Sequence, residues 1–278
     1  MERIRRAVEQ AQQQRQARQE KSPVRPAPLD RAATGPRAKQ AFVPANKVEY
    51  TQTPTIEIDM ATREANRLVA AIPDHPLQDT YRMLRTRVLQ EMTANKWNSI
   101  AVTSPTPDSG KTLTAVNLAI TLAMDLSHTA LLVDADLRRP SVHKYFGYEP
   151  ELGLNDYLYD EEPLSRLLFH PDIDRLTVLP GRLPIRESAE ALGSPEWLSL
   201  ISEITSRYPD RIIVADIAPV LNVDDALTIA PHIDCFLMVA ENGRTSREEL
   251  QKSLELLDGF PVIGTVLNKA EKKIISSY

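Results

Sequence analysis

The chain has few of the features that mark secreted, metal-stapled or membrane-spanning proteins. Its 278 residues include one cysteine, Cys235, in the apolar run CFLMVA, which predicts a buried strand residue and excludes a disulfide framework. The five histidines are scattered and show no metal-ligand spacing. No run approaches about 18 apolar residues, and the N-terminus lacks the apolar core of a signal peptide. We therefore expect a chain that does not span a membrane by itself.

Charge is distributed unevenly. Residues 1–47 contain 11 Lys/Arg and 4 Asp/Glu, whereas the whole chain has a net charge of −5. The first segment is therefore about +7 and the remainder about −12. An acidic body argues against nonspecific nucleic-acid binding. The basic segment is compatible with contact to anionic lipid or an acidic partner, and a merely solvated tail is the favoured alternative.

Residues 101–112, AVTSPTPDSGKT, form a candidate phosphate-binding loop between an apolar strand and an amphipathic helix. In such loops glycine lets the backbone approach a phosphate, lysine reaches the β- and γ-phosphates, and the threonine hydroxyl ligates Mg²⁺. Pro105 replaces the first glycine of the usual loop, and a strand–turn–helix without a ligand is the alternative. The Asp108 charge should repel a triphosphate unless it points outward. We expect the nucleotide contacts to come from Asp108, Ser109, Gly110, Lys111, Thr112 and Leu113.

Acidic residues close two further apolar strands. Asp134 and Asp136 follow Leu131-Leu-Val133, and Asp216 ends Arg211-Ile-Ile-Val-Ala. Ligands of parallel α/β sheets bind outside the carboxyl ends of strands, so these acids should meet the loop. Mg²⁺ coordination and activation of an attacking hydroxyl fit them, and solvated turn carboxylates are the alternative. Arg138 and Arg139 follow directly. We expect them either to stabilise phosphate charge or to form a salt bridge.

Strands alternate with helices over most of the chain, which predicts a P-loop NTPase fold with a mostly parallel sheet covered on both faces. We expect a basic flexible tail with a short helix over 1–56, the P-loop domain over 57–270 and a short tail over 271–278. The expected strands are 99–103, 130–134, 176–180, 211–216, 234–240 and 262–267. The expected helices are 61–72, 77–93, 111–126, 141–146, 195–207, 223–230 and 246–257.

These motifs resemble the bacterial tyrosine kinases of capsule and exopolysaccharide systems. LLVDADLRRP matches that family's second Walker-type motif, and Asp216-Ile-Ala-Pro219 its third. Asp79, Arg82 and Arg85 nearly match the oligomerisation motif E-x-x-R-x-x-R. The ending GTVLNKA, with Asn268 and Lys269, is similar to the exosortase-associated tyrosine autokinases. Asn268 is also placed for adenine recognition, with a plain turn residue as the alternative.

The resemblance implies an ATP-dependent kinase that phosphorylates its own C-terminal tyrosines, with Tyr278 as the acceptor. ATP and Mg²⁺ are the implied cofactors. Lys111 and the loop amides would hold the phosphates, while Thr112, Asp134 and Asp216 would organise Mg²⁺. Asp134, helped by Asp136, would accept the tyrosine proton, and Arg138 would stabilise the transferred charge.

The resemblance also implies a setting. A membrane-bound polysaccharide co-polymerase would recruit and activate the kinase, which places a cytoplasmic protein at the inner membrane through its partner. Asp79, Arg82 and Arg85 would contact a neighbouring subunit of a homo-oligomer. A cognate tyrosine phosphatase is a further implied partner, and nucleic acid is not one.

Three departures keep other functions open. Asp108-Ser109 replaces the usual Gly-Glu of the loop, Asp216 lacks the following hydroxyl residue, and one tyrosine stands in place of a cluster. An ATP-binding scaffold of the export complex without phosphotransfer is the first alternative. A partitioning or positioning ATPase is the second, although Thr106 occupies the position of that class's signature lysine.

Overall fold

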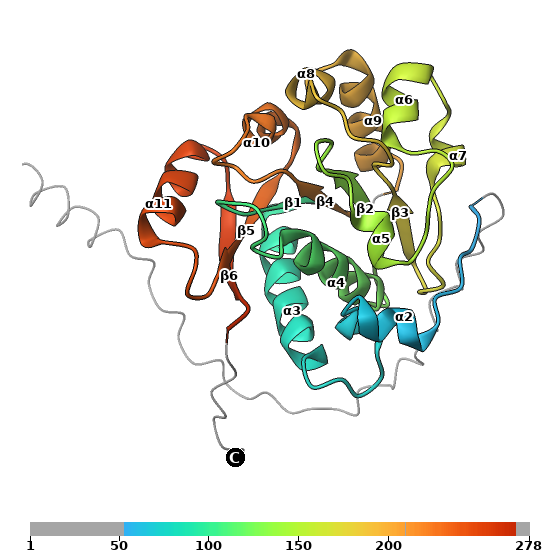
Figure 1. Ribbon diagram of the computed structural model, residues 1–278, viewed down its shortest axis with the longest axis horizontal. Helices are drawn as coiled ribbons and strands as arrows, with labels where there is room; N and C mark the ends of the chain where they lie inside the picture. Colours follow the sequence, from blue (N-terminus) through green and yellow to red (C-terminus); the bar gives the residue numbers. More distant parts are fainter. Residues whose placement is uncertain (1–52, 209, 271–278) are drawn as a thin grey trace, which may run out of the picture. The chain divides into compact units, whose positions relative to one another are not determined.

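The fold is built on a six-stranded sheet in which each pair of neighbouring strands is parallel (Figure 1). The computed structural model describes residues 53–208 and 210–270. The strand order is β3-β2-β4-β1-β5-β6, so β4 lies between β1 and β2. This confirms the parallel α/β fold. The strands are β1 (Ser99–Thr103), β2 (Thr129–Ala135), β3 (Leu176–Leu179), β4 (Arg211–Ile217), β5 (Cys235–Glu241) and β6 (Val262–Asn268).

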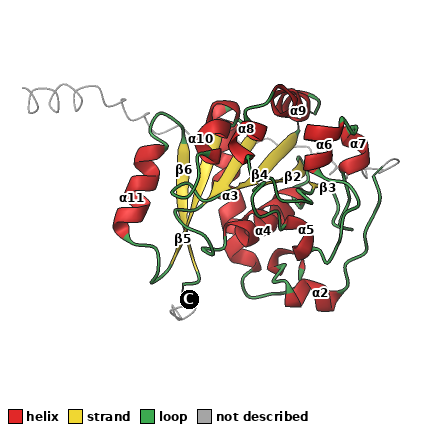
Figure 2. Ribbon diagram, turned by 45° about the horizontal axis from the view of Figure 1, so that its top comes forward, coloured by secondary structure: helices red, strands yellow, loops and turns green. Residues whose placement is uncertain are grey.

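Helices cover both faces of the sheet (Figures 1 and 2). On the first side lie α2 (Met60–Ala65), η1 (Val69–Ala71), α3 (Gln78–Asn95), α4 (Lys111–Ala123) and α5 (Val142–Tyr145). On the second side lie α6 (Leu154–Asp160), α7 (Leu164–Leu167), α8 (Ser188–Leu192), α9 (Pro195–Ser206), α10 (Asp225–Ile229), η2 (Ala230–His232) and α11 (Arg247–Leu256). No helix within 53–208 and 210–270 has the length and apolar character needed to cross a membrane.

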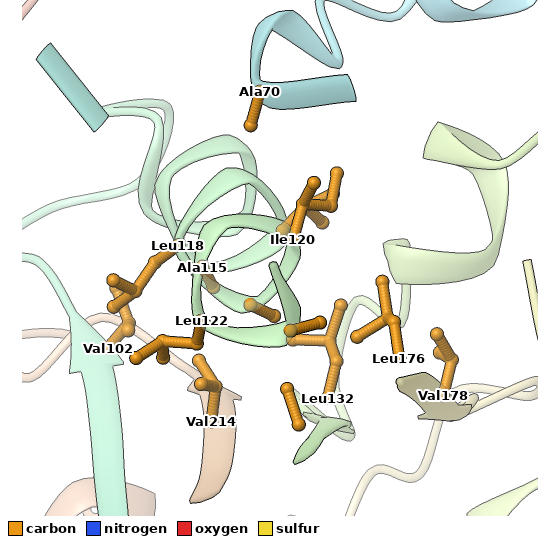
Figure 3. Packing of buried hydrophobic residues seen from close by; sticks show 14 of the residues in the cluster. Ala70, Val102, Ala115, Leu118, Ile120, Leu122, Leu132, Leu176, Val178 and Val214 are labelled. Atoms are coloured by element: carbon orange, nitrogen blue, oxygen red, sulfur yellow. The ribbon is translucent and has the colours of Figure 1, made fainter. Parts of the chain in front are cut away.

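The two-residue period of the strands creates two hydrophobic cores. Val102 points to the first side and Ala101 to the second, each fully buried. Figure 3 shows α4 on the first side, with Leu118 and Leu122 packed toward Val102 and Val214. Helix α4 is apolar nearly all round because the sheet, α3 and η1 enclose it. Its N-terminus is thereby fixed at the carboxyl edge of the sheet.

The structure corrects the expected helix over 61–72. Helix α2 stops at Ala65, Arg67 takes a left-handed φ of 55°, and a short 3-10 turn follows at Val69–Ala71. The apolar run after Arg67 is buried against α4, where the Ala70 N–H donates to Asn117 Oδ1 at 2.9 Å. The apolar spacing over residues 61–72 therefore reflects burial of the segment and not a continuous helix. The short helices α6, α7 and α8 were not predicted.

Some expectations lie outside the described residues. These are the helix over 1–20, most of the linker over 21–56, and the tail over 271–278 with Tyr278. The described part begins at Thr53, and Thr55 already forms a β-bridge with His170.

Candidate functional site

Gly110 ends the loop between β1 and α4. Its φ of 87° is left-handed, and no side chain caps the helix that begins at Lys111. The first N–H groups of α4 therefore face outward without a capping partner, which makes an anion site. The Ser104 and Ser109 hydroxyls both donate to the Thr106 carbonyl, at 2.8 and 2.9 Å. The loop thus closes on itself without the usual first glycine.

Two residues at the end of β6 hold the loop from outside. Asn268 Nδ2 donates to the Ser109 carbonyl at 2.9 Å, and Lys269 Nζ donates to the Asp108 carbonyl at 2.8 Å. Lys269 also pairs with Glu241 at 3.1 Å. The Asn268 amide nitrogen therefore supports the loop backbone, a role that the sequence analysis missed. Asp108 is exposed with a φ of 64°, a conformation that aspartate tolerates.

We expect Gly110→Ala to weaken ATP binding about tenfold, the equivalent of roughly 1–2 kcal/mol of strain. An added Cβ would lie 2.1 Å from Asn268 Nδ2, so the contact between β6 and the loop must shift. Gly243→Ala is the matched control, because it has a φ of 74° and nothing within 4 Å of the added Cβ. Titration calorimetry with ATP measures both. Equal weakening in the two variants would rule out the Asn268 contact as the cause.

Lys111 is buried among carboxylates. Its Nζ lies 2.7 Å from Asp136 Oδ2 and 3.2 Å from both carboxylate oxygens of Asp216. The Thr112 hydroxyl donates to Asp216 Oδ2 at 2.6 Å. Burial favours a lower pKa for Lys111, but Asp216, Asp136 and Asp134 together raise that pKa above its ordinary value. The ammonium is therefore held charged at the start of α4, where phosphates would bind.

Asp134 lies behind this group. It pairs in register with Asp216 because β2 and β4 are neighbours. Its Oδ2 accepts the N–H groups of Ser141 and Val142 at 2.8 and 2.9 Å, while Oδ1 has no hydrogen-bond partner among the described residues. Burial and the Asp216 charge raise the pKa of Asp134 to about 8. Burial also raises the pKa of Asp216, against the opposing effect of Lys111.

The arginines after Asp136 have different environments. Arg138 lines the cleft described below, and its Nε lies 3.8 Å from Asp225 Oδ1. Asp225 is fully buried, accepts the Ser188 hydroxyl at 2.7 Å, and was not singled out from the sequence. Burial raises its pKa, while Ser188 and Arg138 oppose the rise. Arg139 donates its backbone N–H to Asp136 Oδ1 at 3.1 Å, and its side chain is exposed.

A cleft of about 1110 Å³ opens over these residues. Its walls come from the phosphate loop, the start of α4, the segment after β2, the end of β6, and the stretch from Arg67 to Arg87. Asp136, Lys111 and Thr112 line it, whereas Asp134 and Asp216 do not. The structure therefore brings the predicted acids together, but their access to the cleft differs. Asp136 lines the cleft, whereas Asp134 is buried beneath it.

The predicted subunit-contact residues lie on α3. Asp79 and Arg82 form an exposed ion pair at 3.1 Å. Arg85 Nη1 donates to the Thr121 carbonyl at 3.2 Å, near the end of α4. Arg85 therefore ties α3 to α4 within the chain, and contact with another subunit stays a prediction.

Comparison with known proteins places this loop and sheet in a family. Residues 100–276 match the model of the CobQ/CobB/MinD/ParA nucleotide binding domain. The chain belongs to this family of nucleotide-binding domains. MinD of Pyrococcus horikoshii, complexed with Mg-ADP, shares the fold with a TM-score of 0.51 and 18% identity, over 63% of this chain and 72% of that structure.

More similar relatives carry a narrower name. Tyrosine-protein kinase ptk of Acinetobacter johnsonii is 28% identical over 84% of this chain and 31% of its own length. The chain thus spans about a third of that relative. Tyrosine-protein kinase YwqD of Bacillus subtilis is 28% identical over 77% of this chain and 90% of its own length. The kinase domain of Escherichia coli tyrosine kinase ETK superposes with a TM-score of 0.70 at 26% identity, covering 81% of this chain and 92% of that domain.

Proposed function

We propose that the chain is an ATP-dependent protein-tyrosine autokinase of the bacterial type. The observation that carries the proposal is the pair formed by Lys111 and Asp136, 2.7 Å apart in the wall of the cleft. The pair places a cation that can bind the phosphates next to a carboxylate that can accept the proton of an attacking hydroxyl. The cleft of about 1110 Å³ is slightly larger than the usual pocket for one small ligand, so it has room for a nucleotide and a tyrosine side chain. The kinases YwqD and ETK support the assignment.

Each residue has a distinct task in this proposal. The N–H groups from Asp108 to Thr112 and the Lys111 ammonium hold the β- and γ-phosphates. Asp136 accepts the proton of the attacking tyrosine hydroxyl. Arg138, oriented by its ion pair with Asp225, stabilises the charge of the transferred phosphoryl group. Catalysis rests on positioning and charge neutralisation.

The site fits Mg²⁺ that arrives with ATP. Among the described residues, no group of three or more His, Cys, Asp or Glu side chains is arranged to hold a metal ion by itself. The Thr112 hydroxyl and the Asp216 carboxylate, 2.6 Å apart, supply hard oxygen ligands beside the loop, with Asp134 behind. Bound there, Mg²⁺ would be held by the Thr112 hydroxyl and the Asp216 carboxylate and would supply positive charge against the phosphates.

The cellular setting belongs to the same proposal. We extend the proposal, on the resemblance of the motifs, to control of exopolysaccharide or capsule export, an activating membrane-bound co-polymerase and a homo-oligomer formed through α3. A scaffold that binds ATP without phosphotransfer is the second candidate, and the exposed Asp108 in the loop is the feature that favours it.

Incubation of the purified chain with ATP and Mg²⁺ tests the proposal. We expect phosphate on Tyr278 by mass spectrometry, at a higher level when the cytosolic segment of a cognate co-polymerase is added. Asp136→Asn should lower the rate at least about a hundredfold, because the proton acceptor is lost. Phosphate on other tyrosines alone would refute Tyr278 as the acceptor. ATP binding with no phosphotyrosine would favour the scaffold.

A further inference from the structure

One wall of the cleft carries two arginines that the proposed ATP site does not use. Arg67 follows α2, Arg87 lies on α3, and both line the cleft. Neither side chain has an ion pair or a hydrogen bond within residues 53–208 and 210–270. Three other cations of the cleft are already paired, namely Lys111 with Asp136 and Asp216, Arg138 with Asp225, and Lys269 with Glu241, while Arg139 lines the cleft from the segment after β2 and not from this wall. The wall formed by Arg67 and Arg87 is therefore open to a second anionic group.

The backbone holds Arg67 in place. Its N–H donates to the Glu64 carbonyl at 3.1 Å, and its own carbonyl accepts Asn117 Nδ2 at 3.0 Å. The φ of 55° is the left-handed conformation that usually follows a helix, a position where glycine is preferred. An arginine stands here at a conformational cost, with its side chain on the cleft.

Tyr145 lines the same cleft as this wall and Lys111. Burial raises the pKa of Tyr145 and Asp216 raises it further, whereas Lys111 and Arg67 lower it. The Tyr145 side chain is therefore within electrostatic reach of both Lys111 and Arg67. An anionic segment on the arginine wall would lie in the same cleft as Lys111.

The chain has an exposed tyrosine whose acidic neighbours complement the positive charge of the arginine wall. Tyr159, at the end of α6, is 60% exposed and is followed by the exposed Asp160 and Glu161 and by Glu162, which pairs with Arg166 at 2.6 Å. The exposed Tyr208 has the opposite surroundings, since the guanidinium groups of Arg207 and Arg211 lie over its ring. In the sequence Tyr278 follows two lysines, residues 272 and 273, which do not complement an arginine wall.

We infer that Tyr159 of one copy is an acceptor tyrosine for a second copy, with Asp160 and Glu161 bound by Arg67 and Arg87. This rests on the proposed kinase function and adds a second class of acceptor to Tyr278, namely tyrosines with acidic flanks. The Tyr159 oxygen attacks the γ-phosphorus, the bond between that phosphorus and the ADP oxygen breaks, and Asp136 takes the phenolic proton. The product carries a dianion beside three acids at a helix C-terminus, which weakens the last turn of α6.

Peptide binding tests the arginine wall without requiring chemistry. The probe is a fluorescent peptide of residues 153–164 with Tyr157→Phe, added to the full chain with ADP and Mg²⁺. The matched peptide also carries Asp160→Asn, Glu161→Gln and Glu162→Gln. We expect the acidic peptide to bind about fivefold more tightly, a preference that declines with salt. Equal affinities for the two peptides would overturn the inference.

Variants assign that preference to the wall. The double variant Arg67→Ala, Arg87→Ala should bind both peptides equally and should still bind ADP. Arg207→Ala is the control, because it removes an exposed arginine paired with Glu203 outside the cleft. It should keep the fivefold preference. A double variant that also keeps it would overturn the role of the arginines.

Transfer between copies tests the acceptor. A tagged Asp136→Asn chain, whose own phosphoryl transfer should be about a hundredfold slower while Lys111 stays paired with Asp216, is mixed with the parent chain, ATP and Mg²⁺, and its tyrosines are mapped by mass spectrometry. We expect phosphate on Tyr159 of the tagged chain. Phosphate on Tyr278 with none on Tyr159 refutes the inference and leaves the kinase intact. Charge-dependent peptide binding with no phosphotyrosine anywhere refutes the kinase and supports the acidic-segment subsite.

Discussion

Lys111→Met is expected to weaken ATP binding at least tenfold and to lower the free energy of unfolding of the nucleotide-free protein by about 3–5 kcal/mol. The first effect follows from losing the ammonium that meets the phosphates. The second follows from the carboxylates around it, because Asp136 and Asp216 both contact Nζ and would be left buried without a cation. Titration calorimetry and chemical denaturation measure the two effects separately.

A second substitution separates the two causes. Adding Asp216→Asn to Lys111→Met removes one unpaired charge, and the amide oxygen can still accept the Thr112 hydroxyl. Stability should recover in part while ATP binding stays lost. The loss in Lys111→Met should also be larger at pH 8 than at pH 6, because at the lower pH the buried carboxyls take up protons. A single variant as stable as the parent at both pH values would show that Lys111 does not offset the acids.

The site could be predicted where its signals are local. Gly110-Lys111-Thr112 between a strand and a helix, and the acids that close β2 and β4, are patterns within a few residues. The rule that ligands bind at the carboxyl edge of a parallel sheet then brings them together. The strand order was not predicted, and it decides the outcome, because β4 between β1 and β2 sets Asp216 opposite Asp134.

The remaining features depend on contacts between distant segments. Asn268 reaches a loop carbonyl 159 residues earlier in the chain, and no pattern around residue 268 distinguishes this from a turn. Asp225 behind Arg138 looks like an ordinary helix-start acid in the sequence. The residues after Arg67 are apolar because they are buried against α4, and this apolar pattern resembles that of a helix. The left-handed backbone of Arg67, which ends the helix, leaves no mark in the pattern.

Asp134→Asn is expected to make the stability of the nucleotide-free protein less dependent on pH. The pKa of Asp134 is about 8 in the folded state, against an ordinary value of 3.8, so the folded state keeps a proton that the unfolded state releases. Its contribution to stability is therefore complete below pH 3.8 and is lost progressively as the pH rises toward 8. The loss is at most about 1.4 kcal/mol per pH unit for one proton. The amide introduced by Asp134→Asn does not titrate, so the stability of this variant should decline less between pH 5 and 8 than that of the parent.

Asp134→Ala supplies the contrast that identifies the cause. The Asn variant keeps an oxygen for the Ser141 and Val142 N–H groups, whereas the Ala variant leaves both donors unpaired. We therefore expect Asp134→Ala to be less stable than Asp134→Asn at every pH, by about 1–3 kcal/mol, with the same reduced slope. Some slope remains in both, because burial also raises the pKa of Asp216 and of Asp225. Denaturation at several pH values decides the matter: an Asn variant with the slope of the parent would mean that Asp134 is ionised in the folded protein, and its charge would then have to be balanced by Lys111.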